Sequence, residues 1–219
     1  MRILALGAHP DDIEFGCGAS LIRFARAGHE VDLYVATYGE LGGDPAVRKR
    51  EQEDSAAFIG ARNLFWGGYP DCHLPLMAEL VAGVEEVIKE VNPEYIFVHN
   101  IEDTHQDHRF LASATTSATR YIPNFLFYEG PTTVNFFPNV YIDIDGFVDK
   151  KLELLKMHTS QVSKVNVNMP DISVVDIAAS TARFRGIQGR MKIAEAFKSL
   201  RLFIDIPALG CEKDSGENE

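Results

Sequence analysis

Two clusters of histidine and aspartate stand directly after two apolar runs of this chain. His9, Asp11 and Asp12 follow the run "MRILAL" within the stretch "LGAHPDDIEFGCG", and the cluster "HNIEDTHQDHR" (99–109) follows the run "EYIFV". Imidazole nitrogen and carboxylate oxygen are donors that a zinc-type divalent ion takes, and a catalytic zinc site uses three protein ligands plus an open position for water. The two clusters therefore predict a catalytic metal site.

The spacing within each cluster allows its side chains to face one point. His9 and Asp12 are three residues apart where a strand is expected to turn into a helix, and His105 and His108 are also three apart. One histidine of the second pair can complete a three-ligand set with His9 and Asp12, while the other stands near the open position. In an open parallel sheet, ligands bind outside the carboxyl ends of the strands, where we expect both clusters to lie.

Each cluster taken alone also has a simpler interpretation. Aspartate is a favoured N-cap residue, so Asp11 or Asp12 could only cap the helix that follows. His9 could be a hydrogen-bonded turn residue, and the second cluster could be a solvated loop. The presence of both clusters at strand ends favours the metal site over these interpretations.

The elements that must position these residues alternate between strands and helices. Apolar runs predict strands over 3–7, 31–37, 63–69, 94–100, 124–129 and 139–144. Helical periodicity predicts helices over 13–25, 46–59, 75–93, 109–121, 145–158 and 186–199, whereas 163–182 has no clear period. The alternation predicts an α/β fold: a Rossmann-like three-layer sandwich with a mostly parallel central sheet and the active site at the carboxyl-terminal strand ends.

Composition bounds the class of protein. With 219 residues, 46% of them apolar, the chain can bury one core, and we expect a single domain over 1–205 followed by an acidic, disordered tail over 206–219. The net charge of −11 argues against binding to nucleic acid or to anionic lipid. No stretch approaches the roughly 20 apolar residues that span a bilayer. The three cysteines lack the close pairing of a zinc ribbon or a redox motif, so we expect reduced thiols in a cytoplasmic protein. From the charge and the short apolar runs we expect no nucleic-acid partner and no membrane insertion.

Motifs of several other classes are missing. Gly16 and Gly18 match part of a dinucleotide-binding fingerprint, but the third glycine is absent and both fall inside the first predicted helix. The chain has no Walker A sequence and no G-x-S-x-G nucleophile elbow. These absences argue against a nucleotide-binding module and against a serine hydrolase.

Five motifs follow one another over residues 1–200: "AHPDDIEFGCG", Arg48-x-x-Glu51 with Ile59-Gly60, "HQDHR", "HTSQ" and "RGIQGRMKIAEAF". In these motifs the sequence resembles the LmbE-like (PIG-L) family of zinc-dependent N-acetylglucosaminyl deacetylases. The resemblance implies a hydrolase that removes the N-acetyl group from a small acetamido sugar, an N-acetylglucosamine-type sugar or glycoside, with Zn²⁺ or another divalent metal such as Fe²⁺. It also implies a homo-oligomer, since family members form oligomers that include hexamers.

The resemblance assigns the central roles at the site. It implies that His9, Asp12 and His108 are the metal ligands. Asp11 is then the general base that takes a proton from zinc-activated water, and His105 is the acid or the oxyanion stabiliser.

Three further residues match positions of the family pattern. Asp107 would orient His105 through a hydrogen bond, while Arg48 and Asp71 would hold the sugar or frame the pocket. Gln106 replaces the proline that is common inside the H-x-D-H motif, and this change removes no ligand. Two alternatives stay open: a metal-dependent hydrolase of another amide or of an ester, and a non-catalytic protein that binds metal and sugar.

Overall fold

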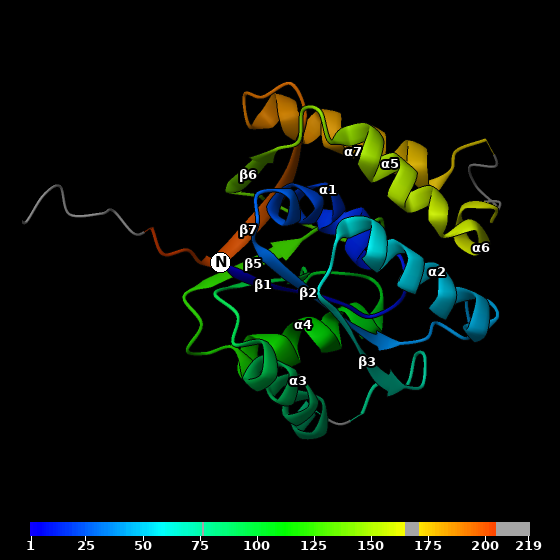
Figure 1. Cartoon of the computed structure of the whole chain (residues 1–219), viewed down its shortest axis with the longest axis vertical. Helices are drawn as coiled ribbons and strands as arrows, with labels where there is room; N and C mark the ends of the chain where they lie inside the picture. Colours follow the sequence, from blue (N-terminus) through cyan, green and yellow to red (C-terminus); the bar gives the residue numbers. More distant parts are fainter. Residues whose placement is uncertain (76, 165–170, 205–219) are drawn as a thin grey trace, which may run out of the picture.

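The computed structural model describes residues 1–75, 77–164 and 171–204, so the predicted tail over 206–219 lies outside the described residues. A seven-stranded sheet with the order β3-β2-β1-β4-β5-β7-β6 forms the middle layer, and helices cover both faces (Figure 1). The strands are β1 (Arg2–Gly7), β2 (Glu30–Thr37), β3 (Asn63–Tyr69), β4 (Tyr95–His99), β5 (Asn124–Tyr128), β6 (Val140–Asp143) and β7 (Ala194–Arg201). The helices are α1 (Asp12–Arg26), α2 (Pro45–Ile59), α3 (Met77–Val91), α4 (Gln106–Ala118), α5 (Val148–Met157), α6 (Thr159–Val162) and α7 (Val174–Gln188). The expected three-layer α/β architecture is confirmed.

Pairing in the sheet is mostly parallel, as predicted. β1 pairs in parallel with β2 and β4, and the parallel set continues to β3 on one side and to β5 on the other. β7 is antiparallel to both of its neighbours, β5 and β6. Because β1 and β4 are parallel neighbours, the residues that follow them emerge at the same edge of the sheet.

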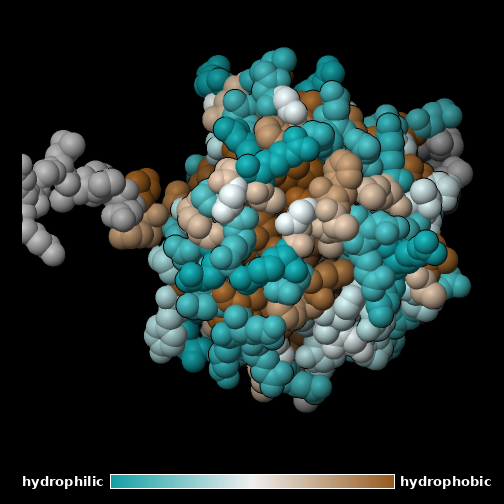
Figure 2. Space-filling model, in the orientation of Figure 1, coloured by the Kyte–Doolittle hydropathy of each residue, from teal (hydrophilic) through white to brown (hydrophobic). Residues whose placement is uncertain are grey.

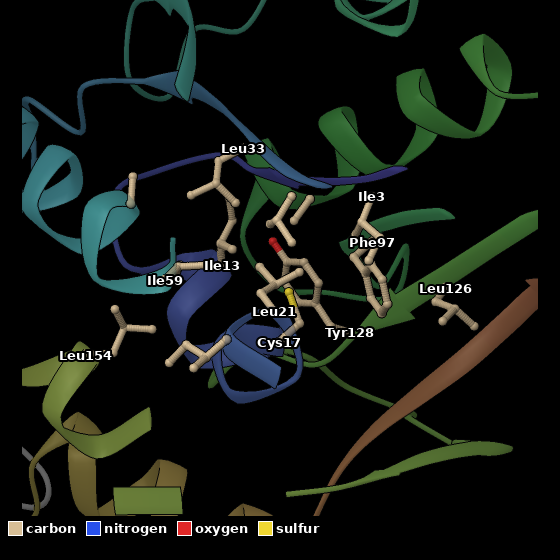
Figure 3. Close-up of a cluster of buried hydrophobic side chains, with 14 of the residues drawn as sticks. Ile3, Ile13, Cys17, Leu21, Leu33, Ile59, Phe97, Leu126, Tyr128 and Leu154 are labelled. Atoms are coloured by element: carbon tan, nitrogen blue, oxygen red, sulfur yellow. The ribbon is translucent and has the colours of Figure 1, made fainter. Parts of the chain in front are cut away.

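Each face of the sheet carries its own hydrophobic core, since successive side chains of a strand point to opposite faces. In β1, Ile3 and Ala5 belong to the core shared with α1, α2 and α5, and Figure 3 shows Cys17 of α1 in this core. Leu4 and Leu6 belong to the core shared with α3 and α4. β1 is therefore buried on both faces, and this fixes the position of the turn that follows it.

The last helix and strand that the structure describes differ from the sequence-based prediction. The helix predicted over 186–199 is wrong, because α7 ends at Gln188 and Ala194–Arg201 form strand β7. This strand contains several good helix formers, but its pairing between β5 and β6 overrides their propensity. α7 begins in the region without a clear period, where Ser173 and Asp176 form a capping box.

The surface is largely polar on the face shown in Figure 2, with smaller apolar areas between the hydrophilic side chains. Among the large apolar side chains of the described residues, Tyr121 and Phe137 are the most exposed. Within the described ranges, none of the helices combines the length and the apolar character needed to cross a bilayer.

A buried ion pair ties the helix that carries the first cluster to the rest of the fold. Nζ of Lys151 in α5 contacts the Glu195 carboxylate of β7 and the backbone carbonyl of Phe15 in α1. The same carboxylate accepts hydrogen bonds from the backbone N–H groups of Ala19 and Ser20, at 3.0 and 2.8 Å. Both charged side chains are almost fully buried. The pair therefore joins α1, α5 and β7 in the buried interior.

We expect Lys151→Met to destabilise the fold by about 3–5 kcal/mol, because it leaves the Glu195 charge buried without its partner. Urea unfolding of both proteins measures this difference. Lys192→Met is the matched control, since Lys192 pairs with Asp145 at the surface and its loss should change stability little. Equal midpoints for Lys151→Met and the parent would contradict the assignment of the pair.

Candidate active site

The structure brings the two polar clusters together at the carboxyl edge of the sheet, as the sequence predicts. His9 lies in the turn between β1 and α1, and His105 and His108 lie at the start of α4, just after β4. Rings of different clusters are in contact. The centroid of the His9 ring is 4.7 Å from that of His105 and 5.5 Å from that of His108.

The Asp12 carboxylate is the point on which these side chains converge. Its Oδ1 lies 3.4 Å from Nε2 of His108, and its Oδ2 lies 3.3 Å from Nδ1 of His9. Oδ2 also lies 3.1 Å from Nε2 of His99 and accepts a hydrogen bond of 2.7 Å from the backbone N–H of His9. Burial raises the pKa of Asp12, but the neighbouring histidines outweigh burial and hold this pKa well below its usual range.

Simple helix capping does not account for the aspartate pair. Asp11 occupies the N-cap position of α1, yet its side chain makes no capping hydrogen bond. The Asp12 carboxylate faces imidazoles rather than the first turn of the helix. Both aspartates are therefore available for chemistry at the site.

The second ring nitrogen of His9 and that of His108 each face a further carboxylate. Nε2 of His9 lies 3.1 Å from Oδ1 of Asp71 and 3.3 Å from Oδ2 of Asp107. Nδ1 of His108 lies 3.3 Å from Oδ1 of Asp103. Histidines that bind metal commonly have this arrangement, with one nitrogen toward the ligand set and the other held by a carboxylate.

Charge in this region is unbalanced toward the negative. Burial lowers the pKa of His9, but hydrogen bonds to Asp107, Asp12 and Asp71 outweigh burial and raise this pKa to about 12. Burial also lowers the pKa of His108, and Asp12 and Asp103 raise it to about 9. The surrounding carboxylates thus favour a positive charge between them, on the histidines or on a bound cation.

The donor atoms are close enough to hold a divalent metal ion. Among the residues that the structure describes, donor atoms within 4.8 Å of one another occur in three groups: His9 with His105 and His108, Asp12 with His99 and His108, and His9 with Asp71 and Asp107. The expected ligands His9, Asp12 and His108 are distributed over these overlapping groups. Nitrogen and carboxylate donors suit zinc and related divalent ions, so the residues present fit such a metal.

Asp11 lies beside Asp12 and faces a cavity at this edge of the sheet. Its backbone has φ 91° and ψ −19°, a conformation that residues other than glycine rarely adopt. Burial and the adjacent charge of Asp12 raise the pKa of Asp11 to about 6. Its Oδ1 lies 3.8 Å from Nη2 of Arg48. The two neighbouring carboxylates therefore have different environments, one among imidazoles and one toward open space.

His105 is held at the N-cap of α4. Its backbone N–H donates to Oδ1 of Asp103 at 2.8 Å, and its Nδ1 accepts a hydrogen bond from the backbone N–H of Asp107 at 3.3 Å. Burial, with the charges of His108 and His9, lowers the pKa of His105. Because Nδ1 accepts, the neutral ring carries its proton on Nε2.

The expected hydrogen bond from the His105 ring to the Asp107 carboxylate is not formed. Oδ2 of Asp107 accepts a hydrogen bond from the backbone N–H of Cys72 at 2.8 Å and lies near Nε2 of His9 instead. Residues two apart on a helix do not face each other, so a first-turn side chain at 107 cannot reach back to 105. Asp107 therefore contacts the expected metal ligand His9 and contributes only its backbone to His105.

Arg48 and Asp71 both line the cavity, and both also form hydrogen bonds with backbone groups of nearby loops. The buried guanidinium of Arg48 donates from Nη1 to the carbonyl of Gly39 at 2.7 Å and from Nη2 to that of Pro10 at 2.8 Å. Oδ2 of Asp71 accepts from the backbone N–H of Leu41 at 3.0 Å. Asp71 thus forms part of the wall of the cavity, and Arg48 holds the turn that precedes Asp11.

The cavity in front of these groups has a volume of about 360 Å³, within the range of small-molecule sites. Its wall combines the polar cluster with apolar and backbone surface from several loops. The lining includes Asp11, His105, Phe15, Leu41, Gly42, Pro131, Thr132 and Gln161. A small polar molecule can therefore reach both aspartates and His105 at once.

Two residues of the second cluster, Asp103 and His99, take part in the site although no role was predicted for them. The Asp103 carboxylate accepts hydrogen bonds from the hydroxyls of Thr132 and Thr133, at 2.7 and 2.8 Å, besides facing His108. His99 stacks on His108 with centroids 3.9 Å apart, and burial lowers the pKa of His99 to about 4. Their positions inside the cluster were a signal, but only the fold shows which partner each one contacts.

We expect Asp103→Asn to weaken metal binding by about 10- to 100-fold, because the amide no longer holds Nδ1 of His108 as a carboxylate does. Titration of the metal-free protein with zinc against a competing chelator measures the affinity. The matched control is Glu102→Gln, since Glu102 is adjacent in sequence and its carboxylate faces the surface residue Lys198. An affinity of Asp103→Asn equal to that of the parent would exclude this role.

Fold and site together define an α/β protein with a candidate metal centre at the carboxyl edge of its sheet. The model of the PIG-L family, described as GlcNAc-PI de-N-acetylase, matches residues 4–119, which is more than half of the chain. The chain therefore belongs to the PIG-L family, and the resemblance seen in the motifs is confirmed.

Similar proteins agree with this membership. An uncharacterised deacetylase, YaiS, of Escherichia coli is 36% identical over 72% of this chain and 90% of its own length. A diacetylchitobiose deacetylase of Thermococcus kodakarensis is 25% identical over 73% of this chain and 70% of its own length. The crystal structure of the conserved protein TT1542 from Thermus thermophilus has a TM-score of 0.82 at 24% identity, covers 96% of this chain and 100% of its own, and supports the fold.

Proposed function

We propose that this protein is a metal-dependent deacetylase that hydrolyses the N-acetyl group of an N-acetylglucosamine-type sugar or glycoside. The observation that carries the proposal is the division of labour between two adjacent carboxylates at one cavity. Asp12 faces His9 and His108, whereas Asp11 faces the open space where a substrate would lie. A protein that only binds metal has no use for the second carboxylate.

The metal would be held by His9, Asp12 and His108, with zinc as the ion that these donors suit well. When bound, a divalent ion activates water and polarises the amide carbonyl. Asp71, Asp103 and Asp107 hold the two histidines from behind, as outer carboxylates do at metal sites.

Asp11 accepts the proton of the attacking water in this scheme. Its carboxylate lies next to that of the expected ligand Asp12 and faces the cavity, so it can reach a water molecule that the cavity holds. As the bond between the carbonyl carbon and the sugar nitrogen breaks, Asp11 passes this proton to the departing amine. Acetate and a free amino sugar are the products.

His105 stabilises the charge that develops on the carbonyl oxygen. Its Nδ1 accepts a hydrogen bond from the backbone N–H of Asp107, so Nε2 carries the proton of the neutral ring and can donate it. A donor fixed in this way before the reaction contributes about 3–4 kcal/mol of transition-state stabilisation in comparable oxyanion sites.

The substrate class rests on the family and its named members. The family description names a GlcNAc-PI de-N-acetylase, and a relative that the chain matches over most of its length is a diacetylchitobiose deacetylase. Both names concern 2-acetamido sugars. The cavity of about 360 Å³ is of the size found for small-molecule sites.

Two measurements on the purified protein test the proposal together. The first is its metal content, and the second is acetate release from N-acetylglucosamine and several of its glycosides, with and without a chelator. We expect bound zinc and chelator-sensitive acetate release that returns when zinc is added back. O-acetyl sugars serve as the comparison, and acetate from these alone would replace the amidase assignment by an esterase. Absence of bound metal, even after addition of zinc, would overturn the proposal.

A further inference from the structure

Helix α2 buries an unusual polar stripe. Arg48, Gln52 and Ser55 lie on one face of this helix at spacings of four and three residues, and all three are buried. A helix that packs on a core normally presents apolar side chains at this spacing. The three polar side chains do not face the core of the sheet, because they contact the turn and the first residues of α1.

The two longest of them hold opposite ends of one peptide group. Nη2 of Arg48 donates to the carbonyl of Pro10 at 2.8 Å, and Oε1 of Gln52 accepts from the backbone N–H of Asp11 at 3.2 Å. That carbonyl and that N–H belong to the same peptide bond. Fixing this plane fixes φ of Asp11, and with it the direction in which the Asp11 side chain leaves the backbone.

The Asp11 backbone needs such support. A residue other than glycine at φ 91° costs about 1–3 kcal/mol and persists only where the surroundings hold it. The next residue along the chain, Asp12, is fixed by the histidines and by the backbone N–H of His9. The Pro10–Asp11 peptide is thus the part of the turn that depends on α2.

The orientation of the Gln52 amide is itself determined by a buried carboxylate. Nε2 of Gln52 donates to Oε1 of Glu14 at 2.6 Å, and the hydroxyl of Ser55 donates to the same oxygen. An ionised carboxylate only accepts, so the NH₂ group must face Glu14 and the amide oxygen must face Asp11. Gln52 and Glu14 are fully buried. The contact with Asp11 therefore has one possible direction.

We propose that Gln52 is a positioning residue: by clamping the Pro10–Asp11 peptide together with Arg48, it aims the Asp11 carboxylate at the substrate. The inference rests on the proposed function for the role of Asp11. The clamp itself is a structural statement and can be tested without any activity.

Gln52→Met keeps the length of the side chain and removes both hydrogen bonds. We expect kcat for acetate release to fall by about 10- to 100-fold, with KM changed less than about threefold and metal content unchanged, since a small misplacement of a reacting group has this effect. In the Asp11→Asn background, Gln52→Met should change the residual rate by less than about threefold, because it acts through Asp11. An equal loss in both backgrounds would show a merely structural role and overturn the proposal.

A reciprocal exchange provides the rescue. In the double variant Gln52→Glu with Glu14→Gln, an oxygen at position 52 still accepts from Asp11, and the amide at position 14 now donates to it. The net charge and the hydrogen bonds that link positions 11, 52 and 14 are conserved, so we expect kcat within a few-fold of the parent. Gln52→Glu alone places two carboxylates together and should lose more. A double variant as slow as Gln52→Met would contradict the clamp.

Asn124→Leu is the matched control for general destabilisation. The buried amide of Asn124 also donates to a backbone carbonyl, of Glu94 at 3.1 Å, and accepts from a backbone N–H, of Phe203 at 2.8 Å. It lies at the start of β5, at the opposite edge of the sheet. We expect a comparable loss of melting temperature with kcat nearly unchanged. If Asn124→Leu lost as much kcat as Gln52→Met, general destabilisation would account for the effect and the proposal would be contradicted.

Amide hydrogen exchange of Asp11 separates the clamp from the proposed function. Loss of the acceptor at position 52 should speed exchange of this N–H by about 10-fold or more in Gln52→Met, and leave it unchanged in Asn124→Leu. Unchanged exchange in Gln52→Met would refute the clamp whatever the enzyme does. Faster exchange in a protein that releases no acetate would keep the clamp and refute the proposed function.

Discussion

Asp11→Asn is expected to lower kcat for acetate release by about 100- to 10,000-fold while metal content stays at the level of the parent. Asparagine has the shape of aspartate, and position 11 faces the cavity rather than the imidazoles of His9, His99 and His108, so the ligand set is undisturbed. What is lost is the group that accepts the proton of the attacking water. A large loss of turnover without loss of metal is therefore the signature of a base.

The measurement combines steady-state kinetics with metal analysis of the same preparations. Asp12→Asn is the informative comparison, because it changes the neighbouring carboxylate that faces three imidazoles. We expect Asp12→Asn to lose metal and activity together. If Asp11→Asn hydrolysed substrate at the parent rate, another group would have to be the base.

His108→Ala is expected to abolish stoichiometric metal binding and, with it, activity. Nε2 of His108 faces Oδ1 of Asp12, and its Nδ1 is held by Asp103. Removal of a ligand should cost more than the about 10- to 100-fold loss in affinity that follows removal of an outer partner. Zinc titration against a chelator measures the loss, and His29→Ala, which removes an imidazole far from the site, is the matched control.

The same variant tests whether Asp103 acts through His108. In the His108→Ala background, Asp103→Asn should have no further effect on the remaining metal affinity, because the side chain that it holds is gone. A further loss of similar size in this background would mean that Asp103 contacts the metal directly. Retention of one metal ion per chain by His108→Ala would require another third ligand, and His105 and His99 are the nearest candidates.

The layers of the fold and the edge of the sheet at which the polar clusters lie follow from local sequence patterns. Apolar runs that alternate with helical periodicity specify a parallel sheet covered on both faces, because a strand buried on both sides must be apolar throughout. β1 and β4 are such strands, and polar residues directly after them can only emerge at the edge of the sheet. Local patterns are sufficient for these features, since each depends on a few neighbouring residues.

Which side chains contact one another depends on the packing of the whole fold. The strand β7 has the residue types of a helix and becomes a strand because β5 and β6 offer it hydrogen-bond partners. Asp107 was expected beside His105 and lies beside His9, because the first turn of α4 points its side chain toward β1. The contact of Gln52 with Asp11 joins residues 41 apart in sequence. No local pattern encodes such pairs, because the free energy of each contact depends on the packing of elements that are distant along the chain.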